Sequence, residues 1–205
     1  MNTGSGSRRR FRERHLIRLA SSILLFSLAC GLGSPGDRPA HWAQPIAMEG
    51  VPNLQRIDDH LFRSAQPTAE GMRRLREMGI RTVVNLRAFH SDRDEIGTLD
   101  LDRVHIPMVT WHPSRRAAVR FLRIVTDPDR IPVLVHCQHG ADRTGALCAL
   151  YRVAVQDWTK EEAIREMVDG GYGFHGIWRN LLTWIRRMHI GLLRRDAGLG
   201  DHGKV

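Results

Sequence analysis

The sequence predicts an α/β fold in which a central, mostly parallel sheet is flanked by helices. Short apolar runs rich in β-branched residues alternate along the chain with segments whose apolar residues recur at helical spacing. Residues that favour helix starts and turns separate the two kinds of segment. This alternation is typical of a parallel sheet, because neighbouring parallel strands need a crossover connection, which is usually a helix.

The predicted elements begin at Asn53, where the apolar pattern becomes regular. Thr68 is a good N-cap and Gly79 a good stop for the first helix. Thr159 and Glu162 have the spacing of a capping box. The predicted strands are Leu54–Ile57, His60–Ser64, Arg81–Leu86, Arg103–Met108 and Ile131–Val135. The predicted helices run from Thr68 to Met78, from Ser114 to Val125, from Thr144 to Gln156, from Thr159 to Val168 and from Ile177 to Met188.

The net charge of +9 is concentrated at the N-terminus. Residues 1–30 contain six arginines against Glu13 alone, so they carry +5, and the rest of the chain carries the remaining +4. A nucleic-acid-binding protein is expected to gather its basic residues on the folded domain. We therefore expect no nucleic acid partner.

The first 32 residues have the composition of an export signal. An arginine-rich segment precedes an apolar stretch, Leu19–Gly33, that is short and rich in small residues. We expect a signal peptide or, alternatively, an N-terminal membrane anchor. The protein is then exported, and either periplasmic or anchored facing out of the cytoplasm. Residues 33–52 are rich in Gly, Pro and Ala and are expected to form a linker, residues 53–190 the main domain, and residues 191–205 a polar tail.

The segment HCQHGADRTG (His136–Gly145) follows directly on the last predicted strand. A helix that begins near Thr144 points unpaired N–H groups and the positive end of its dipole into this segment. Gly140 lets the backbone curl around an anion, and Arg143 adds a planar fork suited to two phosphate oxygens. The same field favours the thiolate form of Cys137, which is a nucleophile. The segment therefore predicts phosphate binding and phosphoryl transfer through a phosphocysteine.

Two other interpretations of this segment are weaker. A turn that merely ends a strand would not need a glycine, an arginine and a threonine at these positions. A metal site of His136, Cys137 and His139 is disfavoured, because adjacent residues on a strand point in opposite directions and no second ligand pair has zinc spacing. We expect neither a metal nor a cofactor. Cys148 lies in an apolar run and is expected to be a core residue.

The sequence resembles the cysteine-dependent protein-tyrosine and dual-specificity phosphatases. His136–Gly145 matches their Cys-x5-Arg-Thr signature, and LFRSAQP (Leu61–Pro67), TVVNLR (Thr82–Arg87) and Tyr151–His175 are similar to a bacterial branch that includes exported enzymes. The resemblance covers roughly Asn53 to His189. It implies a protein-tyrosine-phosphatase-like fold for residues 53–190. It also implies hydrolysis of phosphate monoesters, on phosphotyrosine and with phosphoserine or phosphothreonine as further substrates.

The resemblance also assigns roles to individual residues. Cys137 is the nucleophile, Arg143 binds the phosphate, Thr144 hydrogen-bonds the sulfur, and His136 orients the loop and supports the thiolate. The residues whose backbone forms the phosphate cradle are Gln138, His139, Gly140, Ala141, Asp142 and Arg143.

The sequence departs from the family at the general acid. Such enzymes usually place an aspartate on a separate loop before the cysteine, but Ile106–Leu122 contains neither Asp nor Glu. A proton donor typically raises the reaction rate by about 10²–10⁴-fold. Asp142 is our first candidate for this role and His112 our second. Arg87, His139 and His175 are further candidates for the mouth of the pocket. The acidic residues that we expect to be solvated loop charges are Asp92, Asp94, Asp100 and Asp102.

Four functions remain open. The leading prediction is a cysteine-dependent phosphatase acting on a phosphorylated protein or a small phosphate ester. A phosphate-binding module with little turnover is an alternative, because the usual acid is missing. A phosphoinositide or inositol phosphate phosphatase is another. A rhodanese-like sulfur transferase is disfavoured by the residues that follow the cysteine.

Overall fold

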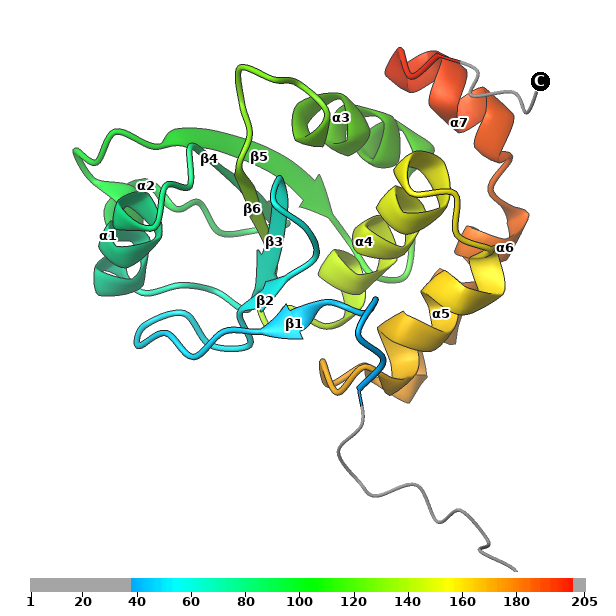
Figure 1. Ribbon diagram of the computed structural model, residues 1–205, viewed down its shortest axis with the longest axis horizontal. Coiled ribbons are helices and arrows are strands. Elements are labelled where there is room, and N and C mark those ends of the chain that lie inside the picture. The colour runs from blue at the N-terminus through cyan, green and yellow to red at the C-terminus, as the bar shows by residue number, and fades with distance from the viewer. Residues whose placement is uncertain (1–37, 201–205) are drawn as a thin grey trace, which may run out of the picture. The chain divides into compact units, whose positions relative to one another are not determined.

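The computed structural model describes residues 38–200 (Figure 1). The predicted leader and the first residues of the predicted linker lie outside this part of the chain, so export and membrane anchoring stay predictions. Between residues 38 and 200, no helix combines the length and the apolar character that crossing a bilayer requires.

One mixed, mostly parallel sheet forms the centre of the described residues, with the strand order β1-β2-β3-β6-β4-β5. The first three strands pair antiparallel, and β3, β6, β4 and β5 are parallel neighbours. The strands are β1 (Gln44–Pro45), β2 (Gln55–Arg56), β3 (Leu61–Ser64), β4 (Thr82–Arg87), β5 (Asp102–Met108) and β6 (Val133–His136). The predicted α/β class with a mostly parallel sheet is therefore confirmed.

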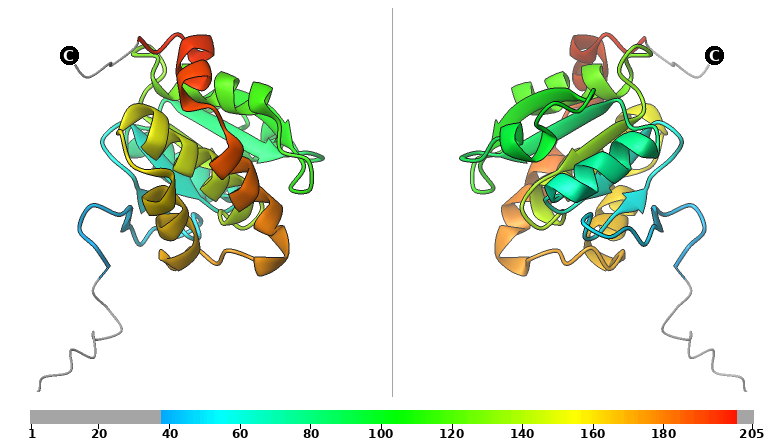
Figure 2. Two further views of the ribbon diagram at one scale, coloured as in Figure 1. Left: turned by 90° about the vertical axis from the view of Figure 1, so that its right-hand side faces the viewer. Right: turned by 90° about the vertical axis from the view of Figure 1, so that its left-hand side faces the viewer.

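Helices cover both faces of this sheet (Figures 1 and 2). One face carries α1 (Ala69–Glu77) and the single turn α2 (Arg93–Ile96). The other carries α3 (Arg115–Val125), α4 (Asp142–Val155), α5 (Lys160–Asp169), the 3-10 turn Gly176–Trp178, α6 (Arg179–Arg187) and α7 (Ile190–Ala197).

The central strand β6 shows how the sheet is buried. Leu134 belongs to the cluster that includes Met72 of α1, whereas Val133 and Val135 belong to the cluster that includes Leu147 of α4. Successive side chains of a strand point to opposite faces, so a strand covered on both faces is apolar throughout. Because β6 lies between β3 and β4, its carboxyl end is in the interior of the sheet and not at an edge.

The predicted helix starts are confirmed at two caps. The Thr68 side chain accepts a hydrogen bond from the N–H of Gly71 at 3.1 Å. Thr159 and Glu162 form the reciprocal capping box. The helix predicted from Thr144 begins two residues earlier, at Asp142, and the one predicted from Ile177 is divided into the 3-10 turn and α6.

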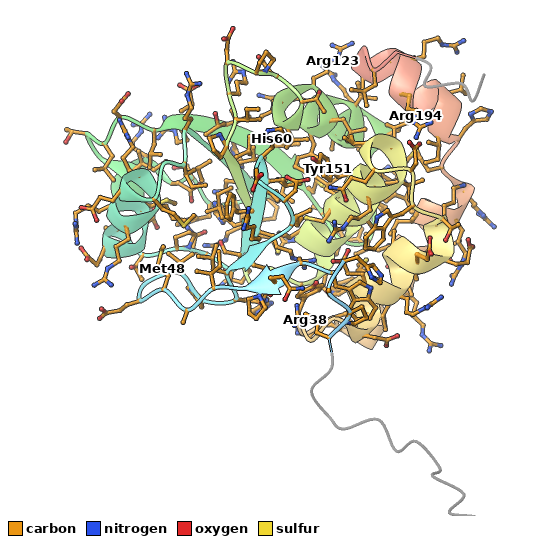
Figure 3. All side chains as sticks on the ribbon, in the orientation of Figure 1. Arg38, Met48, His60, Arg123, Tyr151 and Arg194 are labelled. Atoms are coloured by element: carbon orange, nitrogen blue, oxygen red, sulfur yellow. The ribbon has the colours of Figure 1, made fainter. Side chains whose placement is uncertain are left out.

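The folded part is larger than the predicted 53–190 at both ends. In the predicted linker, β1 joins the sheet and Val51 is buried. In the predicted polar tail, Leu193 of α7 is fully buried in the core. The guanidinium of Arg194 donates to the carbonyls of Ala154 and Val153, and that of Arg123 donates to the carbonyl of Asp196 (Figure 3). Charged side chains thus attach α7 to the domain. Because these residues are polar, the composition of residues 191–205 indicated a tail and not a packed helix.

Candidate active site

Cys137 follows the last residue of β6 and lies between the sheet and the N-terminus of α4. Its side chain is buried. Since α4 has 14 residues and begins at Asp142, its unpaired N–H groups and the positive end of its dipole face the preceding loop. The carboxyl end of a central parallel strand beside a helix N-terminus is a common place for an anion to bind. We call residues 137–143 the phosphate loop.

Gly140 gives this loop its shape. Its φ is +70°, a conformation that glycine adopts without strain. Its backbone also packs so closely on β3 that an added Cβ would lie 2.5 Å from the carbonyl carbon of Ser64. The predicted need for glycine at this position therefore has two physical causes, the φ angle and the close approach to β3.

Arg63 supports the loop by a hydrogen bond to its backbone, a role that the sequence alone does not indicate. Its side chain is 2% exposed and donates to the carbonyl of Gly140 at 2.6 Å. The guanidinium carbon lies 3.8 Å from the centroid of the Tyr172 ring, which makes a cation–π contact. A buried positive charge directly behind the loop adds to the field that attracts an anion.

A pocket of about 280 Å³ opens beside the loop. Arg143 lines it, and the Nε of this side chain is buried without a hydrogen-bond partner among the described residues. Arg87 lines it as well and is held by the side-chain oxygen of Gln66 at 3.0 Å. The full lining is Arg87, Ala88, Phe89, Met108, Val109, Thr110, Trp111, Gln138 and Arg143. The placement of Arg87 at the pocket mouth is thereby confirmed.

The rim of this pocket is aromatic. Phe89 is 93% exposed and Trp111 is 66% exposed, and both belong to the lining. No residue of the lining carries a carboxylate, which agrees with the missing acid in Ile106–Leu122. His112 is exposed and does not belong to the lining, so its assignment as proton donor stays a prediction.

The carboxylate of Asp142 contacts His175 and does not line the pocket. It is buried, and its Oδ1 accepts the backbone N–H of His175 at 2.9 Å. Its Oδ2 lies 2.8 Å from Nδ1 of the same histidine. Since both oxygens are engaged with His175, the geometry favours a positioning role, and the acid role of Asp142 stays a prediction without support from the pocket.

The prediction that Asp92 is a solvated loop charge is wrong. It is completely buried, and its Oδ2 lies 2.9 Å from Nε2 of His136, which is also completely buried. Its Oδ1 accepts from the side-chain amides of Asn85 and Gln66 at 3.0 and 2.9 Å. Asp94, Asp100 and Asp102 are exposed, as expected.

This network lowers the pKa of Asp92. Burial alone would raise the pKa, but the hydrogen bond and the charge of His136, together with the Gln66 amide, outweigh burial. The ring of His136, the residue before the nucleophile, thus has a fixed orientation, because its Nε2 is hydrogen-bonded to the buried carboxylate of Asp92. The predicted role of His136, orienting the loop and supporting the thiolate, stays a prediction.

We expect Asp92→Asn to lower the free energy of unfolding at pH 7 by about 1–3 kcal/mol, because the partner of buried His136 is altered. A carboxyl group whose folded pKa is depressed stabilises the fold above the unfolded value, about 3.9, and this contribution is lost as pH falls through the folded pKa. Urea unfolding at pH 7 and near pH 3 should therefore show a difference that shrinks at the lower pH. Asp94→Asn, at an exposed site, is the control. A pH-independent difference would contradict this account of Asp92.

Thr144 is fully buried, and its hydroxyl has no hydrogen-bond partner among the described residues. This leaves the group available for the sulfur or for a bound oxyanion, and its predicted role is untested. His139 and Gln138 are exposed, and of these two only Gln138 lines the pocket. Cys148 is buried in α4, where burial raises the pKa of its thiol to about 12, in agreement with a core role.

The sequence and the fold are similar to those of known phosphatases. The family model described as DSP-PTPase phosphatase fused to NAD+ kinase matches residues 47–173. The dual specificity protein phosphatase TpbA of Pseudomonas aeruginosa is 34% identical over 165 residues, which cover 80% of this chain and 74% of the relative. The crystal structure of P. aeruginosa TpbA in complex with pTyr superimposes with a TM-score of 0.70 at 31% identity and covers 80% of this chain and all of that one.

The chain belongs to the dual-specificity phosphatase family, and the predicted resemblance is confirmed. A solved structure of the catalytic domain of the PP-IP phosphatase SIW14 from S. cerevisiae shares the fold, with a TM-score of 0.65 at 18% identity over 74% of this chain and 94% of that one.

Proposed function

We propose that this dual-specificity phosphatase hydrolyses aryl phosphate monoesters, phosphotyrosine above all, through a phosphocysteine formed on Cys137. The observation that carries the proposal is the composition of the pocket beside the phosphate loop. Two guanidinium groups, of Arg87 and Arg143, suit a phosphate dianion, and the aromatic side chains of Phe89 and Trp111 suit an aryl ring.

The reaction would follow from this arrangement in two steps. The sulfur of Cys137 attacks phosphorus, the P–O bond to the leaving group breaks, and the ester oxygen leaves with its electron pair and takes up a proton. Water then attacks the phosphocysteine, the P–S bond breaks, and inorganic phosphate is released. The N–H groups of the loop and the guanidinium of Arg143 bind the phosphoryl oxygens throughout.

The absence of a carboxylate from the pocket bears on the leaving group. A phenol has a pKa near 10, so its oxygen leaves as an anion far more readily than an alkoxide. An enzyme without a strong proton donor should therefore prefer phosphotyrosine to phosphoserine and phosphothreonine. The TpbA crystal structure with pTyr shows that a relative binds such a ligand.

The test compares phosphate release from one peptide that carries phosphotyrosine or phosphoserine at the same position. We expect kcat/KM to favour phosphotyrosine by at least about 10²-fold, the low end of what a proton donor contributes. Mass spectrometry of acid-quenched enzyme should find a phosphoryl group on the peptide that contains Cys137. A protein that binds phosphate but releases no product from either peptide would be a binding module.

The aromatic rim is tested separately. We expect Trp111→Ala to raise KM for the phosphotyrosine peptide about 2- to 12-fold, since an aromatic contact contributes about 0.5–1.5 kcal/mol. Hydrolysis of acetyl phosphate, which has a good leaving group but no ring, should not change. Ile177→Ala is a matched control, because Ile177 is 80% exposed but does not line the pocket.

An inositol phosphate is the second candidate substrate class. Within it a diphosphate fits best, because its leaving group is a phosphate, which needs little protonation, whereas a monophosphate ester would expel an alkoxide. The inositol diphosphatase DSP5 of Arabidopsis thaliana is 26% identical over 56% of this chain and 60% of its own length. The pocket offers such a polyanion two guanidinium groups but also two exposed aromatic rings. A higher kcat/KM for an inositol diphosphate than for the phosphotyrosine peptide would favour this candidate.

We also propose that the enzyme acts outside the cytoplasm, on the basis of the arginine-rich and apolar segments of residues 1–32. If the segment is a signal peptide, the intact mass of protein from the native host should show its loss. If it is an anchor, the full-length protein should be found in the membrane fraction. A full-length, cytosolic product would contradict export.

A further inference from the structure

Two histidines and an aspartate lie together at the edge of the phosphate loop, outside the pocket. One ligand atom from each of His139, Asp142 and His175 can be chosen so that all three atoms lie within 4.8 Å of one another. The two imidazole rings are 5.2 Å apart between centroids and are inclined at 55°. We propose that these three side chains form a binding site for a transition-metal ion of the Zn²⁺ class.

The donor set determines which ion fits. Two imidazole nitrogens and one carboxylate oxygen are ligands that Zn²⁺ takes, with a further position left for water or another group. Mg²⁺ and Ca²⁺ prefer sites built of oxygen ligands. The single carboxylate, of Asp142, supplies the negative charge of the set. The site should therefore discriminate strongly for Zn²⁺ over Mg²⁺.

The two segments that carry the ligands are already joined to each other. The side-chain amide of Asn53 donates to the carbonyl of His139 at 3.0 Å and to that of Tyr172 at 2.9 Å. The carboxylate of Asp142 accepts the backbone N–H of His175 at 2.9 Å. Because these bonds fix the backbone on both sides, an ion would bind without first ordering the chain.

Only the side chains have to adjust. In the present structure Oδ2 of Asp142 and Nδ1 of His175 are 2.8 Å apart, the separation of a hydrogen bond. Bonds of about 2.0–2.1 Å to a tetrahedral zinc ion separate two ligands by about 3.3 Å. The ion would thus replace a shared proton at the cost of a small displacement. Both histidines are exposed, so their rings are free to turn toward it.

A bound ion would connect the phosphate loop with the segment around His175. His139 and Asp142 stand on either side of Gly140 and Ala141, the residues at which the loop bends. Metal binding would therefore affect the phosphate loop, although none of the three metal ligands lines the pocket.

The experiment is calorimetric titration of tag-free, full-length protein with ZnCl₂, in a Cys137→Ser background that removes the thiolate as a competing ligand. We expect one equivalent of Zn²⁺ to bind and Mg²⁺ not to bind. Adding His139→Ala or His175→Ala should weaken binding at least about tenfold, since a directly bound ligand should matter no less than its outer partners, whose loss costs 10–100-fold. His60→Ala, at an exposed histidine outside the cluster, should bind like the parent.

Three results would overturn the proposal. The first is equal affinity in the parent and in both histidine variants. The second is binding by the wild-type protein that disappears in Cys137→Ser, because the thiolate would then be the ligand. The third is anomalous diffraction at the zinc edge that places the ion away from His139 and His175, a measurement that stands even if a variant folds poorly.

Discussion

Replacing Cys137 with serine is expected to reduce phosphate release by on the order of 10⁴-fold or more, as loss of a catalytic nucleophile typically does. A serine hydroxyl is almost entirely protonated at neutral pH, so no anionic nucleophile remains. Binding of inorganic phosphate should persist, because the groups that hold it are the loop backbone and Arg143, whose Nε has no partner among the described residues. Turnover assays together with calorimetry of phosphate binding separate the two effects.

Cys148→Ser is the matched control for this substitution. It makes the same chemical change at the other cysteine of the described chain, which is buried within α4 and lies outside the phosphate loop. It should cost stability but leave kcat largely intact. Near wild-type turnover by Cys137→Ser would exclude the covalent mechanism, and loss of phosphate binding together with turnover would show that the sulfur also shapes the loop.

The phosphate loop was predictable because its determinants are local. A strand, a cysteine, a glycine and an arginine at the start of a helix are contiguous in sequence, and each has a physical reason for its position. Gly140 shows this most clearly, because a positive φ and a close approach to β3 both require glycine. The capped helices were predictable for the same reason, since a cap involves residues three apart.

The supports of the loop depend on contacts between distant residues, and the sequence did not reveal them. Asp92 and His136 are 44 residues apart, and they meet because β4 pairs with β6. Arg63 reaches Gly140 because β3 pairs with β6 on the other side. One signal was available. LFRSAQP (Leu61–Pro67) contains both Arg63, which donates to Gly140, and Gln66, which donates to Asp92. From the sequence alone, this segment indicates only a family resemblance.

Asp142 illustrates a different limit. Its position beside Arg143 indicated a proton donor, but position along the chain does not determine where a side chain points. At the first position of α4 the carboxylate turns toward the segment after α5, where the N–H and the ring of His175 are available. Both oxygens are thus engaged with His175, and the pocket lining contains no carboxylate. The acid role of Asp142 stays a prediction, and the lining favours substrates with good leaving groups.

Gly140→Ala is expected to damage both stability and catalysis. A non-glycine residue at φ +70° is strained by about 1–3 kcal/mol. The new Cβ would also lie 2.5 Å from the carbonyl carbon and oxygen of Ser64 and 2.6 Å from the nitrogen of Ala65, which are backbone atoms that cannot turn aside. Overpacking adds about 1–3 kcal/mol. We expect a loss of about 2–6 kcal/mol in the free energy of unfolding, measured with urea.

The catalytic loss follows from the same displacement. Moving the backbone away from β3 carries the converging N–H groups with it, and a shift of about 1 Å can cost on the order of 10²-fold in rate. Gly198→Ala is the matched control, because Gly198 has a φ of +78° but no atom within 4 Å of an added Cβ. It should show the strain alone, about 1–3 kcal/mol, with unchanged activity. Equal losses of stability in both variants, with activity retained in Gly140→Ala, would show that the contact with β3 does not shape the phosphate loop.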